Sequence, residues 1–171
     1  MPKFQDIPQY THWGHYSCSV SWQYLFSTLD DYNEFGLDMN PDFQRGHVWT
    51  RKQSIAYVEF GLKGGRGGRD ILFNCPGWHL GKRKGEFVLV DGKQRLNAVI
   101  MFLKDELPAF GCLRKEYTDK MNSLEQRFLF HINDMETRRE MLQWYLDLNT
   151  GGVVHTSEEI EKVKFLLEKE R

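Results

Sequence analysis

The chain has 171 residues, of which 40% are hydrophobic and 14% aromatic, so it can bury a sizeable core and suits one domain. Its formal net charge of -1 lacks the basic surplus of proteins that coat nucleic acid, so any DNA contact would be a local patch. The 3 cysteines form no CxxC pair, which argues against a disulfide framework and favours a reducing compartment. No signal peptide and no run of about 18 apolar residues is present, so we expect a cytoplasmic protein without a membrane segment.

Hydrophobic periodicity and turn residues predict strands and helices from residue 16 onward. Residues 1–15 contain prolines and no periodicity, so we expect an N-terminal arm followed by a single domain over residues 16–171. The expected strands are residues 16–20, 71–74, 86–90 and 127–133. The expected helices are residues 22–32, 51–62, 93–104, 136–148 and 157–169. Because strands and helices interleave irregularly, the predicted fold class is α+β, a compact mixed fold with a small sheet and C-terminal helices.

Side chains that cap helices support three of these helix starts. Ser21 suits the N-cap of the first helix, while Thr50 with Gln53 and Thr156 with Glu159 have the spacing of capping boxes. Residues 37–49 are expected to be extended or turn-like, and residues 105–126 follow no clear pattern. The side chains expected to point into the core are Trp22, Leu25, Phe26 and Leu29; Ile55, Val58 and Leu62; Leu96, Val99, Ile100 and Leu103; and Met141, Leu142, Tyr145 and Leu148.

Residues 89–103, LVDGKQRLNAVIMFL, predict a strand, a tight turn and a helix. Asp91 is expected to be the N-cap of the helix, and Gly92 lets a ligand approach the backbone closely. Lys93 and Arg95 add positive charge to the positive end of the helix dipole, at a cost of about 0.3–1 kcal/mol each. A bound phosphate would reverse the sign of that interaction. The alternative is that both cations point into water and Asp91 is merely a cap.

Residues 40–50, NPDFQRGHVWT, bring an acid, an amide, a guanidinium and an imidazole together in an irregular segment. These groups belong to Asp42, Gln44, Arg45 and His47. Loops on a rigid scaffold often carry functional side chains, so the segment is a candidate part of a site. The alternative is a structural turn in which Arg45 pairs with Asp42 and the aromatic residues join the core.

Three further patterns have both a functional and a structural interpretation. The glycine-rich residues 61–70 fail the Walker A pattern and suit a flexible connection, although Arg66 and Arg69 could reach a ligand as a lid. The run Lys82–Lys84 suits a solvated turn or a contact with a DNA backbone. The tryptophans could stack on bases, but Trp22, Trp49 and Trp144 lie on apolar faces and suit the core better.

An HxxHxxC pattern formed by His12, His15 and Cys18 could begin a zinc site. A closed zinc site needs four ligands, and Cys75 or His79 would have to supply the fourth. Neither is paired with the first three in sequence, so we expect no metal centre here.

Three segments together resemble one known family. The segments are PDFQR-x-x-VW near residue 41, VDG-x-QRL near residue 90 and N-x-GG near residue 149. They are similar to motifs of the DGQQR-box family, within the ParB/sulfiredoxin-like superfamily. The family includes the N-terminal GmrS-type domain of GmrSD modification-dependent restriction enzymes. The resemblance covers roughly residues 16–168 and implies a compact α+β fold that binds and hydrolyses nucleotides at the strand–turn–helix.

By this resemblance, Asp91, Gly92, Gln94 and Arg95 are the box residues. Gln44 and Arg45 match the upstream motif, and Asn149 matches the N-x-GG motif. The chain departs from the family at Lys93, where glutamine is common; lysine can bind phosphate, but a role that needs an amide would be lost. No HNH nuclease segment occurs in the sequence, so we expect a stand-alone version of the domain. The reactive cysteine of sulfiredoxin is absent from the box, which argues against reductase chemistry.

The resulting hypothesis is a nucleotide-binding module that acts in phage defence or DNA-modification sensing. Its expected activity, if it is an enzyme, is that of a nucleoside triphosphatase. Gly92 and Lys93 would receive the phosphates, Arg45 and Arg95 would clamp them, and Asn149 would contribute to binding. Asp91 or Asp42 would hold Mg²⁺ through water, and Gln44 or Gln94 would orient the attacking water. Two alternatives stay open. One is a DNA-binding or ParB-type nuclease domain using the same basic groove, and the other is an inert adaptor that binds an effector protein.

Overall fold

The computed structural model describes residues 2–7, 9–10, 16–44, 46, 48–121, 124–150 and 157–170. Its strands are β1 (Tyr16–Ser21), β2 (Leu37–Asp38), β3 (Asp70–Asn74), β4 (Phe87–Asp91) and β5 (Arg127–Asn133). Its α-helices are α1 (Leu25–Glu34), α2 (Arg51–Leu62), α3 (Lys93–Leu103), α4 (Arg138–Thr150) and α5 (Ser157–Lys169). Short 3-10 turns are η1 (Phe4–Asp6), η2 (Trp22–Tyr24), η3 (Trp78–Leu80) and η4 (Arg114–Glu116). The α+β class predicted from the sequence is confirmed.

The described strands form one mixed sheet in the order β1-β5-β3-β4-β2. Neighbours β1 and β5 run antiparallel, β5 and β3 parallel, β3 and β4 antiparallel, and β4 and β2 parallel. The register of β3 against β4 shifts between Leu72 and Phe73, so that Leu72 lies opposite Asp91 while Phe73 lies opposite Leu89. This bulge lies at the end of β4, where the chain turns into α3.

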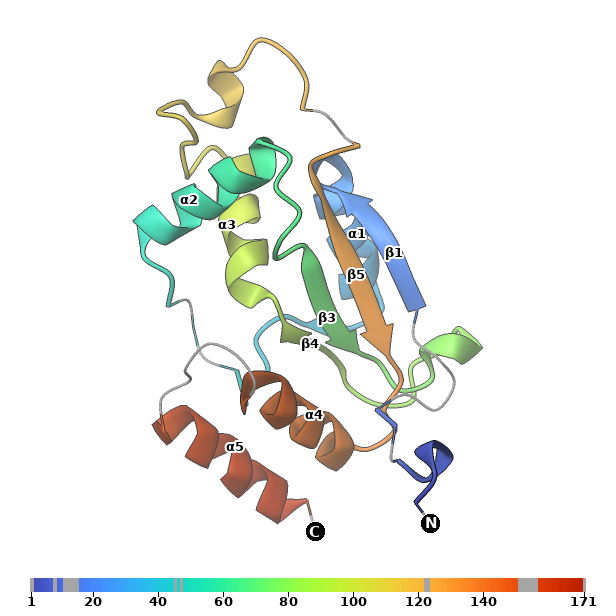
Figure 1. The fold of residues 1–171 in the computed structure, drawn as a ribbon. Helices are drawn as coiled ribbons and strands as arrows, with labels where there is room; N and C mark the ends of the chain where they lie inside the picture. Colours follow the sequence, from blue (N-terminus) through green and yellow to red (C-terminus); the bar gives the residue numbers. More distant parts are fainter. Residues whose placement is uncertain are drawn as a thin grey trace.

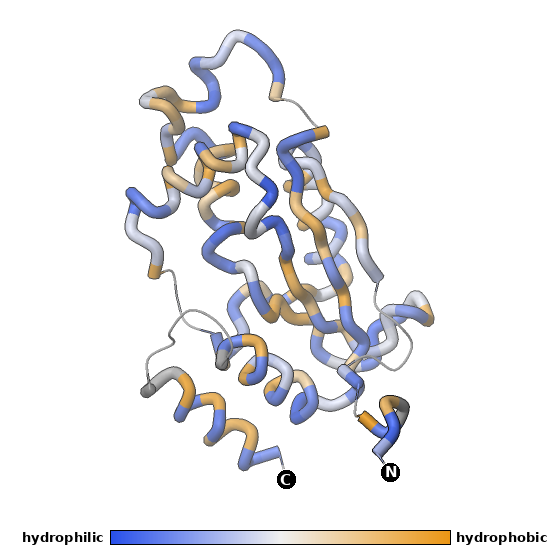
Figure 2. The backbone as a smooth tube through the Cα atoms, in the orientation of Figure 1, coloured by the Kyte–Doolittle hydropathy of each residue, from blue (hydrophilic) through white to orange (hydrophobic). Residues whose placement is uncertain are grey.

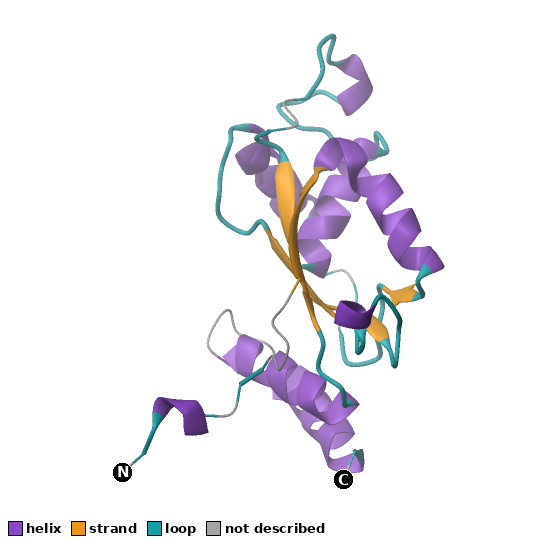
Figure 3. Cartoon of the chain, turned by 90° about the vertical axis from the view of Figure 1, so that its right-hand side faces the viewer, coloured by secondary structure: helices purple, strands orange, loops and turns teal. Residues whose placement is uncertain are grey.

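Helices α1, α2 and α3 cover one face of the sheet and enclose the larger core (Figures 1 and 3). Alternate residues of the central strands point into it, among them Ile71 and Phe73 of β3 and Phe128, Phe130 and Ile132 of β5, all nearly inaccessible to solvent. This alternation is the period of two that predicted β5 from the sequence. The face is rich in aromatic rings, with Tyr32 in contact with Phe73, Phe87 and Phe130.

Helices α4 and α5 pack on the opposite face, around a second hydrophobic cluster (Figure 1). Val88 and Val90 of β4 enter this cluster, together with Phe43 from the irregular segment before α2. Hydrophobic residues follow the strands and alternate with polar ones along α4 and α5 (Figure 2). Arg138 at the start of α4 forms ion pairs with Asp42 and Glu86. These ion pairs hold the segment around residue 42 beside the start of β4.

Most predicted elements agree with the structure to within one to three residues, and the helix over 51–62 has the predicted bounds. The Thr50 capping box is confirmed: Thr50 Oγ1 accepts from the Gln53 N–H at 3.3 Å, and Gln53 Oε1 accepts from the Thr50 N–H at 2.8 Å. The second capping box falls on residues whose side chains lie outside the described part of the chain, as do residues 11–15 of the expected arm.

Two side chains predicted to be buried are exposed. Phe26 is 39% exposed because α1 begins at Leu25 after a 3-10 turn, which shifts the buried stripe to Leu25, Leu29 and Tyr32. Leu148 is also 39% exposed, because it lies near the end of α4 beyond the residues that pack against β4 and α5. Within the described residues, no helix is long and apolar enough to cross a membrane.

Candidate functional site

The turn between β4 and α3 is built on a glycine that no other residue can replace without strain. Gly92 is buried with φ 98, and a Cβ atom there would lie 2.5 Å from Ile71 Cδ1 and 3.3 Å from the Asp70 carbonyl oxygen. Gly92 is itself the N-cap of α3, and it provides no side chain to cap the helix. The prediction that Asp91 is the N-cap is therefore wrong, since Asp91 completes β4 opposite Leu72.

The carboxylate of Asp91 instead accepts a hydrogen bond from Arg95, with 2.6 Å between Oδ2 and Nη2. The Arg95 side chain is 24% exposed, and its Nε is buried without a hydrogen-bond partner among the described residues. Its aliphatic part runs beside Gly68, where a Cβ would lie 3.4 Å from Arg95 Cδ. Tyr57 covers the same place and donates to the Gly68 carbonyl at 2.6 Å; burial raises its pKa to about 12, so it stays a donor at neutral pH.

Two glutamines predicted as site residues hold the segment before α2 against the turn. Gln44 Nε2 donates to the carbonyls of Leu89 and Val90, at 2.5 and 2.7 Å. Gln94 Oε1 accepts from the N–H groups of Val48 and Trp49, at 3.0 and 3.2 Å, and its Nε2 donates to Gly46 at 2.9 Å. Every polar atom of the Gln94 carboxamide is thus used by backbone, whereas the bonds that Gln44 makes to β4 use its Nε2.

A small pocket of ≈ 70 Å³ lies at the N-terminus of α3. It is lined by residues 90–94 together with Gln44, Tyr145 and Asn149, so most of the predicted site residues come together here. Its size suits a phosphate group and excludes a whole nucleotide. Arg95 does not line it, and reaches its edge only through Asp91. Tyr145 was predicted as a core residue, and nothing in the local pattern marks it as a pocket residue.

Lys93 is the cation of this pocket. Burial lowers the pKa of its ammonium group below the ordinary value, because the charged form loses hydration, and Asp38 of β2 partly offsets the shift. Asn149 Nδ2 donates to the Tyr145 carbonyl at 2.6 Å, one turn back in α4, which fixes the amide beside the pocket. No acidic residue occurs in the first turn of α3. The helix dipole and Lys93 both place positive charge at this helix start, and the pocket carboxylate of Asp91 is paired with Arg95.

Several other predicted groups are engaged elsewhere. Asp42 lies outside the pocket and accepts from Arg138 at 2.5 Å. In the glycine loop, Arg69 is 8% exposed and donates to the Gly65 carbonyl at 3.0 Å, so it closes the loop rather than extending as a lid, whereas Arg66 is exposed. Arg45 and His47 lie outside the described residues.

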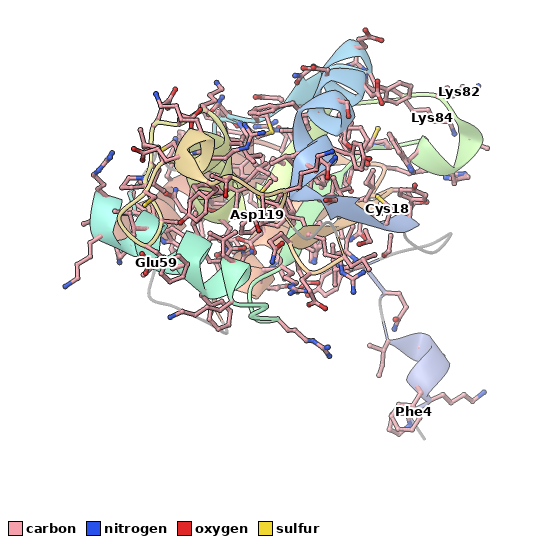
Figure 4. All side chains as sticks on the ribbon, turned by 90° about the horizontal axis from the view of Figure 1, so that it is seen from above. Phe4, Cys18, Glu59, Lys82, Lys84 and Asp119 are labelled. Carbon is pink, nitrogen blue, oxygen red and sulfur yellow. The ribbon has the colours of Figure 1, made fainter. Side chains whose placement is uncertain are left out.

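The other candidate patterns are the tryptophans, the basic run Lys82–Lys84 and the HxxHxxC pattern. Trp22 and Trp144 are buried, and Trp49 packs against Tyr57. Lys82 and Lys84 are exposed on the loop before β4 and project at the edge of the molecule, as seen from above (Figure 4). His12 and His15 of the zinc pattern lie outside the described residues. Within those residues, no group of three side chains could hold a metal ion.

A larger cavity of ≈ 780 Å³ lies at the other end of α3, among Leu62, Phe102, Tyr117 and neighbouring residues of the irregular segment 105–126. It shares no residue with the pocket at Gly92. The two are separated by the length of α3, about 16 Å for its 11 residues. We give the smaller pocket more weight as a phosphate site, because it combines the first backbone N–H groups of α3 with a half-buried lysine, Lys93.

Comparisons with known proteins add no further constraint. A scan against protein-family models, a search of curated proteins and a search of solved structures each find no match.

Proposed function

We propose that the chain binds the phosphates of a nucleoside triphosphate at the N-terminus of α3. The observation that supports this most strongly is the pocket in which the uncapped helix start meets Lys93. Unpaired N–H groups of a first helical turn and the helix dipole both favour an anion. The desolvation that lowers the pKa of Lys93 would be offset by a bound phosphate, which adds the missing negative charge.

The other residues act around this contact. Arg95 would assist by exchanging its bond with Asp91 for one with a phosphate oxygen, because arginine binds phosphate with several donors. Asn149 would donate or accept at the open side of the pocket. By the motif resemblance, Arg45 would be a second arginine that binds the phosphates. Because the pocket holds only a phosphate-sized group, the nucleoside would lie outside it, against the surface between α3 and α4.

A divalent cation accompanies most bound triphosphates, and Mg²⁺ prefers oxygen ligands. Asp91 is the pocket carboxylate that fits, with a side chain 46% exposed, whereas Asp42 is paired with Arg138. Mg²⁺ would neutralise phosphate charge there.

Hydrolysis extends the proposal by one step. A water would have to be oriented beside the terminal phosphate. Of the two glutamines considered for this role, Gln94 has its carboxamide occupied by backbone, so Gln44 Oε1 is the better candidate. The context of phage defence or DNA-modification sensing, which the motif resemblance suggests, belongs to the same proposal.

The test is calorimetric titration of ATP, GTP and CTP with Mg²⁺ into wild type, Lys93→Ala and Lys52→Ala. Lys52 is the matched control, since it is an exposed lysine in the first turn of α2, which a capping box closes. A charge-assisted contact of about 1.5–3 kcal/mol predicts roughly 10–150-fold weaker binding for Lys93→Ala. Lys52→Ala should bind like wild type. A colorimetric phosphate-release assay on the same proteins, with Gln44→Ala added, tests hydrolysis.

The proposal fails if no nucleotide binds wild type, or if the two lysine variants bind equally well. Salt-sensitive binding of a DNA duplex by wild type, with no nucleotide binding, would instead support the DNA-binding alternative.

A further inference from the structure

Three polar side chains from neighbouring strands form a hydrogen-bonded row on the sheet. Ser17 of β1 lies opposite His131 of β5, and Ser17 Oγ is 2.8 Å from His131 Nδ1. His131 Nε2 is 2.8 Å from Asp70 Oδ1 on β3. A hydroxyl, an imidazole and a carboxylate thus lie in sequence, although they come from residues 53 and 61 positions apart along the chain. None of the three lines the pocket at Gly92.

With a neutral imidazole, one arrangement of protons satisfies the two hydrogen bonds of this row. An ionised carboxylate can only accept, so Asp70 requires a hydrogen on His131 Nε2. A neutral imidazole then has a lone pair on Nδ1, which accepts the hydrogen of the Ser17 hydroxyl. This is the tautomer in which histidine can act as a general base toward the serine.

The location leaves the hydroxyl accessible. Residues Tyr16 and Cys18 pack toward the larger core, so Ser17 projects from the opposite face, where both Ser17 and Asp70 are exposed. The half-buried His131 is held between them. β1 lies at the edge of the described sheet, where no second described strand pairs with its outer side.

We propose that Ser17 is an activated nucleophile, with His131 as its general base and Asp70 as the residue that positions His131, and that it accepts an acyl group from an ester. Two leucines lie next to the row: Leu72 is opposite His131, and Leu129 is opposite Asp70. Their apolar side chains suit an apolar acyl group. This site is separate from the proposed phosphate site and would operate without a nucleotide.

In the reaction, Ser17 Oγ forms a bond to the ester carbonyl carbon while its proton passes to His131 Nδ1. The bond from that carbon to the alcohol oxygen then breaks, and the alcohol leaves with the proton from His131. The products are an acyl-serine and a free alcohol. A water molecule that gives its proton to the same Nδ1 then attacks the acyl-serine, which releases a carboxylic acid and restores the hydroxyl.

The experiment treats the full chain with a fluorophosphonate probe and with p-nitrophenyl butyrate, and locates the adduct by peptide mass spectrometry. The variants are Ser17→Ala, His131→Gln and Asp70→Asn. Ser19→Ala is the matched control, because Ser19 is also exposed on β1 but lies opposite Leu129 instead of a histidine. We expect an adduct on Ser17, none on Ser19, and labelling about 10²–10⁴-fold slower in His131→Gln. Thermal unfolding of each variant checks that the fold is retained.

The positioning role of Asp70 has its own measurement. Imidazole nitrogen NMR of wild type should show the hydrogen of His131 on Nε2, and Asp70→Asn should move it toward Nδ1 and slow labelling. The proposal is overturned if Ser17 reacts no faster than Ser19, or if His131→Gln labels at the wild-type rate in a folded protein. Either outcome would make the row a structural hydrogen-bond network.

Discussion

Helices α2 and α3 begin alike in sequence and differently in structure. Each has two cations among its first three residues: Arg51 and Lys52 in α2, and Lys93 and Arg95 in α3. In α2, the side chains of Thr50 and Gln53 form a complete capping box. In α3, the N-cap is Gly92, which has no side chain, and the first turn opens into a pocket.

The difference shows that cations at a helix start do not by themselves indicate an anion site. At α2 their cost is met by a cap and by exposure to water. At α3 the glycine provides no side chain to cap the first N–H groups, and Lys93 loses part of its hydration. The presence or absence of a cap is therefore the feature that separates the two helix starts, and three changes test it.

Blocking the open helix start should have the largest effect. In Gly92→Val, side-chain atoms would overlap Ile71 and force the positive φ of 98 on a β-branched residue. Backbone strain of about 1–3 kcal/mol and overpacking of a similar size predict a loss of about 2–6 kcal/mol in the free energy of unfolding. Urea denaturation measures it, and nucleotide binding should be lost as well.

Gly111→Ala is the control for this change. Gly111 also has a positive φ, of 80, but a Cβ there meets nothing within 4 Å. Only the backbone strain of about 1–2 kcal/mol should therefore appear. Equal losses in the two variants would contradict the close approach of Ile71 to Gly92.

Opening the capped helix start should have an intermediate effect. Thr50→Ala removes the acceptor of the Gln53 N–H, which should lower the free energy of unfolding by about 0.5–2 kcal/mol. Thr28→Ala on α1 is the control, because Thr28 donates to the Tyr24 carbonyl four residues back and caps nothing. That variant should stay within about 0.5 kcal/mol of wild type. A Thr50→Ala protein as stable as wild type would remove the energetic distinction between the two helices.

The smallest effect is the pH dependence at Lys93. Since its pKa is lowered in the folded protein, the unfolded chain binds this proton more tightly. Desolvation of the charged Lys93 therefore lowers the free energy of unfolding by its full amount at pH values below the lowered pKa, and this effect disappears as the pH rises toward 10.5. The free energy of unfolding of wild type should therefore rise with pH relative to Lys93→Met, as measured by urea denaturation at several pH values. A difference that falls with pH would contradict the desolvation of Lys93.

Local patterns predicted the elements whose causes are local. Thr50 and Gln53 lie three residues apart, so their capping box and the helix it begins follow from the sequence. Phe26 and Leu148 were misplaced because periodicity gives the direction of a helix face and does not show whether another element covers it. Asp91 was misplaced because a bulge in the β3–β4 pairing extends β4 by one residue.

The sequence by itself determined that a glycine turn joins a strand to a cation-bearing helix at residues 91–95. Only the tertiary structure decided which distant groups meet there. Gln44 donates to the carbonyls of β4, Gln94 bonds to the backbone before α2, and Arg95 pairs with Asp91 without lining the pocket itself. The same holds for Ser17, His131 and Asp70, which the strand order β1-β5-β3 brings together. Contacts within a few residues follow from helix and turn geometry, whereas contacts across the chain depend on strand order and register.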